Sequence, residues 1–405
     1  MARSPLTLAA AASAALSDAE IRQARRLTAG GSGRFDAALL TLADGDDVVV
    51  RIPNDDDALA DVDSEIIALR ALTAGAREVL GIRAPEVRGS APMDDRRVVV
   101  TSYLPGYQVE AAHIPAGRGV AGEIGRAIAR VHGLPPSVVR SAGLPERSPA
   151  DARADLDRLL DRIGRSGRVP VRLMVRWREA VEDDRLWGYE STVVLGGAQA
   201  TSFVLQNDAR DEPSVTGVLD WQGLAIGDPA IDLHWTASAP DAADDVFRAY
   251  ADASVRAPDG ALRVRARLHA ELEFARWLVH GLDTHRSDVV DDAADLLDSL
   301  SAGLVDDVLL ADLPLRERAD VSEAIALLDR VPRTHTGESD TSMHTDAFGP
   351  EELRLHGDET WDAAPPRAAD GLEETQPVGG ASPETQPVDA DDATQPTTPP
   401  DARDR

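Results

Sequence analysis

The chain has 405 residues, of which 43% are hydrophobic, so it is long enough for two ordinary domains or one large two-lobed domain. Its net charge of −29 argues against binding to nucleic acids and to anionic membranes, and no apolar run reaches the roughly 18 residues of a membrane span. The sequence contains no cysteine and no lysine, which excludes disulfides, thiolate metal sites, thiol nucleophiles and Schiff-base chemistry. We expect a cytoplasmic protein.

The N-terminal stretch MARSPLTLAAAASAALSDAE is rich in alanine, the best helix former, and predicts a surface helix. Its single arginine, apolar run and small residues are also compatible with a secretory signal, which stays open as the alternative.

Residues 21–110 carry the pattern of strands with one helix. Asp44 and Gly45 form a hairpin-turn signal that precedes the strand VVVRIP. The segment DVDSEIIALRAL then has apolar residues at helical spacing, and RRVVVTSYLPG is a strand that ends at a Pro-Gly breaker. We expect residues 1–105 to form a small β-rich lobe that includes the N-terminal helix.

From about residue 120 the apolar period changes to that of helices, which predicts a helical lobe over residues 106–333. One isolated hairpin is expected inside this lobe, within residues 191–221. The predicted helices cover residues 122–134, 152–163, 171–181, 228–238, 244–254, 261–282, 291–304 and 316–331.

The last segment, residues 334–405, has 17 acidic residues against four arginines and is rich in proline and glycine. Such a composition buries too little apolar surface to offset the entropy of ordering, so we expect a disordered acidic tail. Its TQP repeats place Thr375, Thr385 and Thr394 in similar contexts. These threonines are either phosphorylation sites for a phosphopeptide-binding partner or parts of a neutral spacer.

The stretch VTGVLDWQGLAIGDPAIDLHW, residues 215–235, suits a cation site. An apolar strand runs into Asp220, and Mg²⁺ prefers one or two such carboxylates together with phosphate oxygens. Asp220 is alternatively a turn residue. Asp228 before Pro229 is typical of a helix cap, and Asp232 either braces a loop through backbone N–H groups or is solvated.

This order of features resembles the aminoglycoside phosphotransferase and choline kinase-like family, with macrolide phosphotransferases as the nearest branch because VVVRIP is similar to their third strand. The resemblance implies an α+β, protein-kinase-like two-lobed fold, a small-molecule ligand, and the cofactors ATP (or another nucleotide) and Mg²⁺.

The resemblance also implies roles for single residues. Residues 101–106 would be the hinge beside the adenine, and Arg51 would bind the nucleotide phosphates where kinases use lysine. Glu65 would form an ion pair with Arg51, although a solvated Glu65 is the alternative. Asp220 would bind Mg²⁺. The loop GGSGRF would cover the phosphates through Gly30, Gly31 and Gly33, unless it is a plain hairpin.

The sequence departs from the family at the catalytic loop, whose pattern in the family is HGDxxxxN. The segment VLGGAQATSF places Gly196 and Gly197 at the first two positions, Ala198 at the catalytic Asp and Phe203 at the metal-binding Asn. No base is therefore expected at position 198.

We expect a phosphotransferase-family pseudoenzyme that binds a nucleotide or another ligand, or a weak atypical kinase. Two alternatives stay open: an active phosphotransferase acting on a hydroxyl of an aminoglycoside- or macrolide-like small molecule with ATP and Mg²⁺, and an interaction module acting through its tail. An active enzyme would need a base from elsewhere, with Asp208, Asp228 and Asp232 as the nearest carboxylates. Asn207 and Asp208 are more typical of an exposed hairpin turn.

Overall fold

The computed structural model describes residues 3–16, 19–27, 33–93, 95–117, 119–304 and 307–313. Gly30 and Gly31, the predicted helix at 316–331 and the tail at 334–405 with its three TQP threonines lie outside these residues. Of the helices that are described, none combines the length and the apolar composition needed to cross a bilayer.

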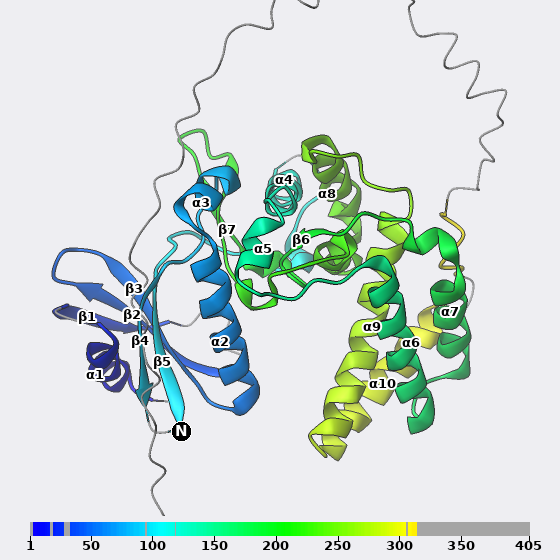
Figure 1. The fold of residues 1–405 in the computed structure, drawn as a ribbon, viewed down its shortest axis with the longest axis horizontal. Coiled ribbons are helices and arrows are strands. Elements are labelled where there is room, and N and C mark those ends of the chain that lie inside the picture. Colours follow the sequence, from blue (N-terminus) through cyan, green and yellow to red (C-terminus); the bar gives the residue numbers. More distant parts are fainter. Residues whose placement is uncertain are drawn as a thin grey trace, which may run out of the picture. The chain divides into compact units, whose positions relative to one another are not determined.

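The N-terminal lobe is built on a five-stranded sheet, antiparallel throughout, with strand order β1-β2-β3-β5-β4 (Figure 1). Residues in β3 alternate between buried and partly exposed, as expected for a strand whose two faces contact different surroundings. The strands are β1 (Ile21–Arg26), β2 (Phe35–Leu42), β3 (Asp47–Pro53), β4 (Val87–Met93) and β5 (Arg96–Ser102).

The predicted N-terminal helix is present as α1 (Pro5–Ala15), which is capped by the Ser4 hydroxyl. Leu8 and Ala12 of α1 pack against one face of the sheet, on the side chains of Val48, Val50 and their neighbours. The helix is therefore part of the hydrophobic core of this lobe.

The helix α2 (Asp56–Ala71) lies on the other side of the sheet, where Val62 and Ile66 pack against Val99 (Figure 1). A second helix, α3 (Ala74–Leu80), follows directly, so the expectation of one helix in this region was wrong. With seven residues it is too short to show an apolar period, and only its Thr73 cap and its left-handed terminal residue Gly81 mark it in the sequence.

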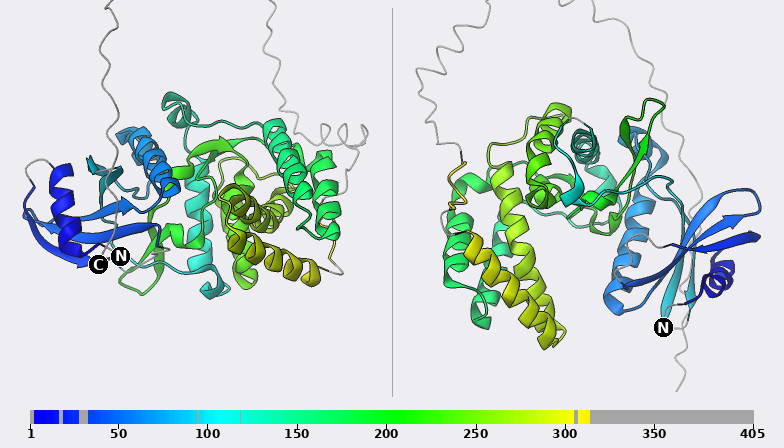
Figure 2. Two further views of the ribbon diagram at one scale, coloured as in Figure 1. Left: turned by 90° about the horizontal axis from the view of Figure 1, so that it is seen from below. Right: turned by 180° about the vertical axis from the view of Figure 1, so that it is seen from behind.

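The C-terminal lobe is mainly helical, as predicted, and its longest helix contacts both α10 and the segment before α8. The helices α6, α7, α9 and α10 lie together in both views of Figure 2. The α-helices are α4 (Val120–His132), α5 (Ser137–Ser141), α6 (Pro149–Ser166), α7 (Val171–Glu182), α8 (Pro240–Ala253), α9 (Leu262–Asp283) and α10 (Ser287–Gly303).

Two short sheets, rather than one hairpin, lie within this lobe. The predicted hairpin consists of β7 (Phe203–Asn207) and β8 (Pro213–Val218), and a second pair joins β6 (Thr192–Val194) to β9 (Ala225–Gly227). Strands of three residues carry no alternation that a sequence pattern can reveal. Residues 229–238, expected as an α-helix, form the 3₁₀ segment η5 (Pro229–Ser238).

One hydrophobic core extends from the end of the first lobe into the second. It combines Leu69, Leu80 and Ile82 with Ile128, Phe203 and Trp221. The helix α2 also packs against the 3₁₀ turn η4 (Trp221–Gly223), which follows Asp220 directly. The predicted two-lobed, protein-kinase-like α+β fold is confirmed, and it places α2 next to the turn that follows Asp220.

Candidate functional site

Arg51 and Glu65 form the ion pair that the sequence predicted. The Arg51 guanidinium donates to Glu65 Oε2 at 2.5 Å. Arg51 lies on β3 and is partly exposed, and Glu65 lies on α2 and is buried. The Arg51 guanidinium also lies 5.7 Å from the ring centroid of Phe35 on β2. Arg51 is thus held in one place on the sheet, and its binding to phosphate stays a prediction.

Gly33 ends the predicted phosphate loop and precedes β2. Its φ of +78° lies in the left-handed region that favours glycine, and its carbonyl accepts a hydrogen bond from the Asn54 side chain at 2.8 Å. This bond attaches the end of the loop to the end of β3.

The predicted hinge, residues 101–106, begins with the last two residues of β5, and Tyr107, the next residue after it, pairs with the C-terminal lobe. Tyr107 exchanges both backbone hydrogen bonds with Leu205 of β7, at 2.8 and 2.9 Å. Gly106 allows this approach, because a Cβ at its position would lie 2.4 Å from the Leu205 carbonyl oxygen. The hinge therefore lies beside the strand that follows the predicted catalytic loop.

Asp220 is exposed and adopts a left-handed backbone with φ of 59°, an uncommon conformation for a residue other than glycine. Its Oδ2 accepts a hydrogen bond of 2.7 Å from the buried Ser202 hydroxyl, and the N–H of Leu219 donates to the Ser202 carbonyl. These contacts place the carboxylate against the loop that precedes β7. Within the described part of the chain no hydrogen bond or ion pair engages its Oδ1 atom, which leaves this oxygen available for a cation.

Asp232 braces the predicted catalytic loop, which was one of the two readings of this residue. Its buried carboxylate accepts hydrogen bonds from the backbone N–H groups of Leu195, Gly197 and Ala198 at 2.6, 2.8 and 3.1 Å. His132 of α4 contacts the same carboxylate through Nε2 at 3.1 Å. The backbone of the loop is therefore held in place by a side chain of another segment, η5.

The side chains at the two expected catalytic positions are buried and apolar. Ala198 is 2% exposed, and Phe203, the first residue of β7, is fully buried in the shared core. The contact of Ser202 with Asp220 supports the placement of the loop, because Ser202 directly precedes the position expected for the metal-binding Asn.

Asp228 caps η5, as predicted, and also takes part in a buried ion pair. It accepts from the Ala230 N–H at 3.0 Å and from the Arg265 guanidinium at 2.9 Å, and it contacts His269 at 3.2 Å. Burial acts to raise the pKa of Asp228, but Arg265 and His269 outweigh it and hold the pKa below its ordinary value. These contacts give Asp228 a structural role, since they connect η5 to α9.

Asn207 and Asp208 lie at the end of β7 and in the β7–β8 turn, as the sequence indicated. Asp208 accepts from the N–H groups of Arg210 and Glu212 at 2.7 and 3.0 Å, and Asn207 bonds Tyr107 and Asp211. Their side chains shape the turn and the hinge.

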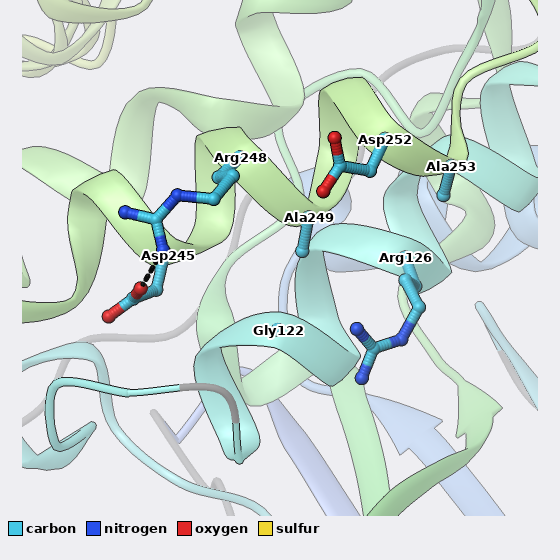
Figure 3. A pocket seen from close by; sticks show the side chains of 7 residues that line it. All are labelled: Gly122, Arg126, Asp245, Arg248, Ala249, Asp252 and Ala253. Atoms are coloured by element: carbon cyan, nitrogen blue, oxygen red, sulfur yellow. Dashed lines mark hydrogen bonds and ion pairs between the residues drawn. The ribbon is translucent and has the colours of Figure 1, made fainter.

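A surface pocket of about 250 Å³ lies between α4 and α8 (Figure 3). Two ion pairs, Arg126 with Glu123 and Arg248 with Asp245, engage its arginines, and none of the predicted site residues lines it. The pocket is separate from the candidate site.

The residues present fit Mg²⁺ only together with phosphate. In the described ranges no group of three or more histidines and carboxylates could coordinate a metal, so Asp220 belongs to no such group. Mg²⁺ commonly binds one or two protein carboxylates together with nucleotide phosphates. No hydrogen bond or ion pair among the described residues joins Asp220 to Arg51 or Glu65.

Sequence reasoning missed Ser202 and His132, which contact Asp220 and Asp232, and the pair Gln199 and His234, whose side chains contact each other. Only Ser202 had a signal, since a hydroxyl directly precedes the position of the lost Asn. The histidines act across long sequence separations, and no local pattern assigns them a partner.

Comparison with known proteins identifies the family and the fold of the chain. Residues 25–269, more than half of the chain, match the model of the phosphotransferase enzyme family. No curated protein matches.

Solved structures show the same fold. The apoenzyme of macrolide 2'-phosphotransferase from Brachybacterium faecium is 24% identical, with a TM-score of 0.60 over 72% of this chain and 97% of its own. The GDP complex of wild-type aminoglycoside 2'-phosphotransferase-IIIa is 17% identical, with a TM-score of 0.58 over 74% of this chain and 99% of its own. The chain belongs to the phosphotransferase enzyme family.

Proposed function

We propose that this chain is a nucleotide-binding pseudoenzyme of the phosphotransferase family, which binds a nucleoside triphosphate with Mg²⁺ and transfers its phosphoryl group to alcohols poorly at most. The observation that carries the proposal is the loop held by Asp232. Its backbone is fixed by three hydrogen bonds, yet the two positions that need a base and a metal ligand carry Ala198 and Phe203.

The nucleotide half of the proposal rests on three groups. Arg51 is fixed by Glu65, Asp220 has a carboxylate oxygen that no described residue engages, and Tyr107, directly after the predicted hinge, pairs with β7. A guanidinium binds phosphate oxygens in a bidentate manner, which makes Arg51 competent although it replaces a lysine. A related fold with GDP bound is known, the GDP complex of the aminoglycoside enzyme.

The catalytic half of the proposal rests on the two missing groups, the base and the second metal ligand. A positioned base contributes about 10²–10⁴ to the rate of proton transfer steps, and a second metal ligand helps to neutralise the developing charge. The three nearest carboxylates do not compensate. Asp228 and Asp232 are buried and fully engaged, and Asp208 shapes an exposed turn.

The test of nucleotide binding is a thermal-shift series with ATP and GTP, each with and without Mg²⁺. We expect stabilisation by the nucleotide, an additional shift with Mg²⁺, and no shift with Mg²⁺ alone. Asp220→Asn should remove the Mg²⁺-dependent part, whereas Asp252→Asn, an exposed change on α8, should leave it intact. A series without any nucleotide shift contradicts the proposal.

The test of catalysis uses the unmodified protein with ATP, Mg²⁺ and a panel of aminoglycosides, macrolides and simple alcohols. Turnover above about 1 per second on any acceptor, an ordinary kinase rate, would favour the active phosphotransferase instead. Single Asn substitutions at Asp208, Asp228 and Asp232 would then identify its base.

A further inference from the structure

The side chain that the predicted catalytic loop exposes is that of Gln199. Ala198 before it and Ala200 after it are both 2% exposed, whereas Gln199 is exposed. Its amide nitrogen Nε2 lies 2.9 Å from Nε2 of His234, which comes from η5. The loop thus presents an amide supported by a buried imidazole, one residue beyond the position of the missing base.

The hydrogen bonds of His234 determine how this amide is oriented. Nδ1 of His234 lies 2.6 Å from the Ile231 carbonyl, which only accepts, so Nδ1 carries the proton. Nε2 is then free to accept, and it accepts from the Gln199 amide nitrogen. This arrangement turns the amide oxygen of Gln199 away from the imidazole. An amide oxygen has two lone pairs, so it has acceptor capacity for a water molecule.

Gln199 is also linked to the metal carboxylate. Its backbone N–H donates to the Ser202 hydroxyl at 3.1 Å, and that hydroxyl donates to Asp220 at 2.7 Å. Two consecutive hydrogen bonds therefore connect Gln199 to the residue at which a Mg²⁺-bound nucleotide would place its terminal phosphates. A water held by Gln199 would lie on the acceptor side of such a phosphate.

We propose that Gln199, oriented by His234, positions a water molecule for slow hydrolysis of a bound nucleoside triphosphate. The water oxygen forms a bond to the γ-phosphorus, and the bond from the γ-phosphorus to the bridging oxygen breaks. The electron pair leaves with the diphosphate, and the proton of the water ends on the released phosphate. A glutamine is sufficient for this role, because phosphoryl transfer depends mainly on positioning. The inference rests on the proposed nucleotide binding.

The first test measures phosphate release from ATP and from GTP under single-turnover conditions with Mg²⁺. We expect a rate on the order of 10⁻⁴ to 10⁻³ per second, the range of a glutamine-containing nucleotide hydrolase without an arginine finger. Gln199→Ala should lower this rate at least tenfold, and Gln23→Ala, an exposed change on β1, should leave it unchanged. Gln199→Glu, which keeps an acceptor oxygen, should retain more of the rate than Gln199→Ala.

The second test measures binding. ADP with aluminium fluoride imitates the phosphoryl group in flight beside an in-line water, so it should stabilise the protein more than ADP does. Gln199→Ala should lose this extra shift and keep the shift with ADP alone. His234→Phe preserves the volume of the ring but not its hydrogen bonds, and it should reduce the extra shift in the same direction.

The outcomes separate the two proposals. Nucleotide binding with equal phosphate release and equal aluminium fluoride shifts in the wild type and Gln199→Ala overturns the role of Gln199 and leaves the proposed function standing. Absence of any nucleotide shift overturns both.

Discussion

At the scale of single residues, one 3₁₀ segment and its cap supply two buried carboxylates with different tasks. Asp228 binds Arg265 and His269 of α9, and Asp232 binds the N–H groups of the loop after β6. Burial acts to raise the pKa of Asp232, but the hydrogen bond from His132 and those from the loop outweigh it and lower the pKa. Asp232 is therefore ionised and serves as a permanent acceptor.

Asp232→Asn tests this task. The substitution removes the charge and places an NH₂ group against backbone donors, so we expect a loss of about 3–5 kcal/mol in the free energy of unfolding, as for other broken buried ionic contacts. Urea denaturation measures the loss, with Asp252→Asn as an exposed aspartate control. A loss equal to that of the control would show that the loop is held by other contacts.

At the scale of elements, α1 shows most clearly a burial that the sequence pattern did not predict. The helix has the composition of a surface helix, and yet Leu8 is 1% exposed while Leu6 is 77% exposed. Close packing against β3 makes one face of this alanine-rich helix part of the core. The small size of its alanines allows the helix to approach the sheet.

Leu8→Ala and Leu6→Ala form a matched pair within α1. Removing the buried side chain leaves a cavity, so Leu8→Ala should lower the free energy of unfolding by about 2–5 kcal/mol. Leu6→Ala should change it by no more than about 0.5 kcal/mol. Thermal and urea denaturation of the whole chain measure both values. Equal, small effects would mean that α1 does not contribute to the stability of the lobe.

At the scale of the whole molecule, the buried titratable groups predict how stability depends on pH. Burial lowers the pKa of His269, and the raising effect of Asp228 only partly offsets this. As the pH falls, His269 is therefore protonated at a lower pH in the folded protein than in the unfolded chain. Stability from this group is present above about pH 6.5 and is lost as the pH falls below it. The lowered pKa values of Asp228 and Asp232 add a second loss below about pH 3.9.

Urea denaturation between pH 3 and pH 8 checks this two-step profile. We expect the midpoint to decrease first below about pH 6.5 and again, more steeply, below about pH 4. His269→Gln keeps a donor for Asp228 and cannot titrate, so it should flatten the upper step only. A profile in which His269→Gln retains the upper step would assign that step to another group.

Much of this molecule was readable from local sequence patterns. Short-range periodicity predicts the strands around the hairpin turn, the strand before Asp220 and most helices. Local residue patterns predict the cap at Asp228, and the match to a loop pattern assigns the apolar residues at positions 198 and 203. The pairing of Arg51 with Glu65 followed from the resemblance, and the structure contains it. Such features need only neighbours in the chain, or a family pattern, to be recognised.

The tertiary structure decided everything that depends on contacts between distant residues. Asp232 reaches Gly197 across 35 positions, and Gln199 meets His234 across the same separation. Ser202 donates its hydrogen bond to Asp220 only because β7 and β8 pair and bring the two residues together. A hydrophobic period says which face of an element is buried but not against what, so the bracing of the loop and the orientation of Gln199 exist only in the folded chain.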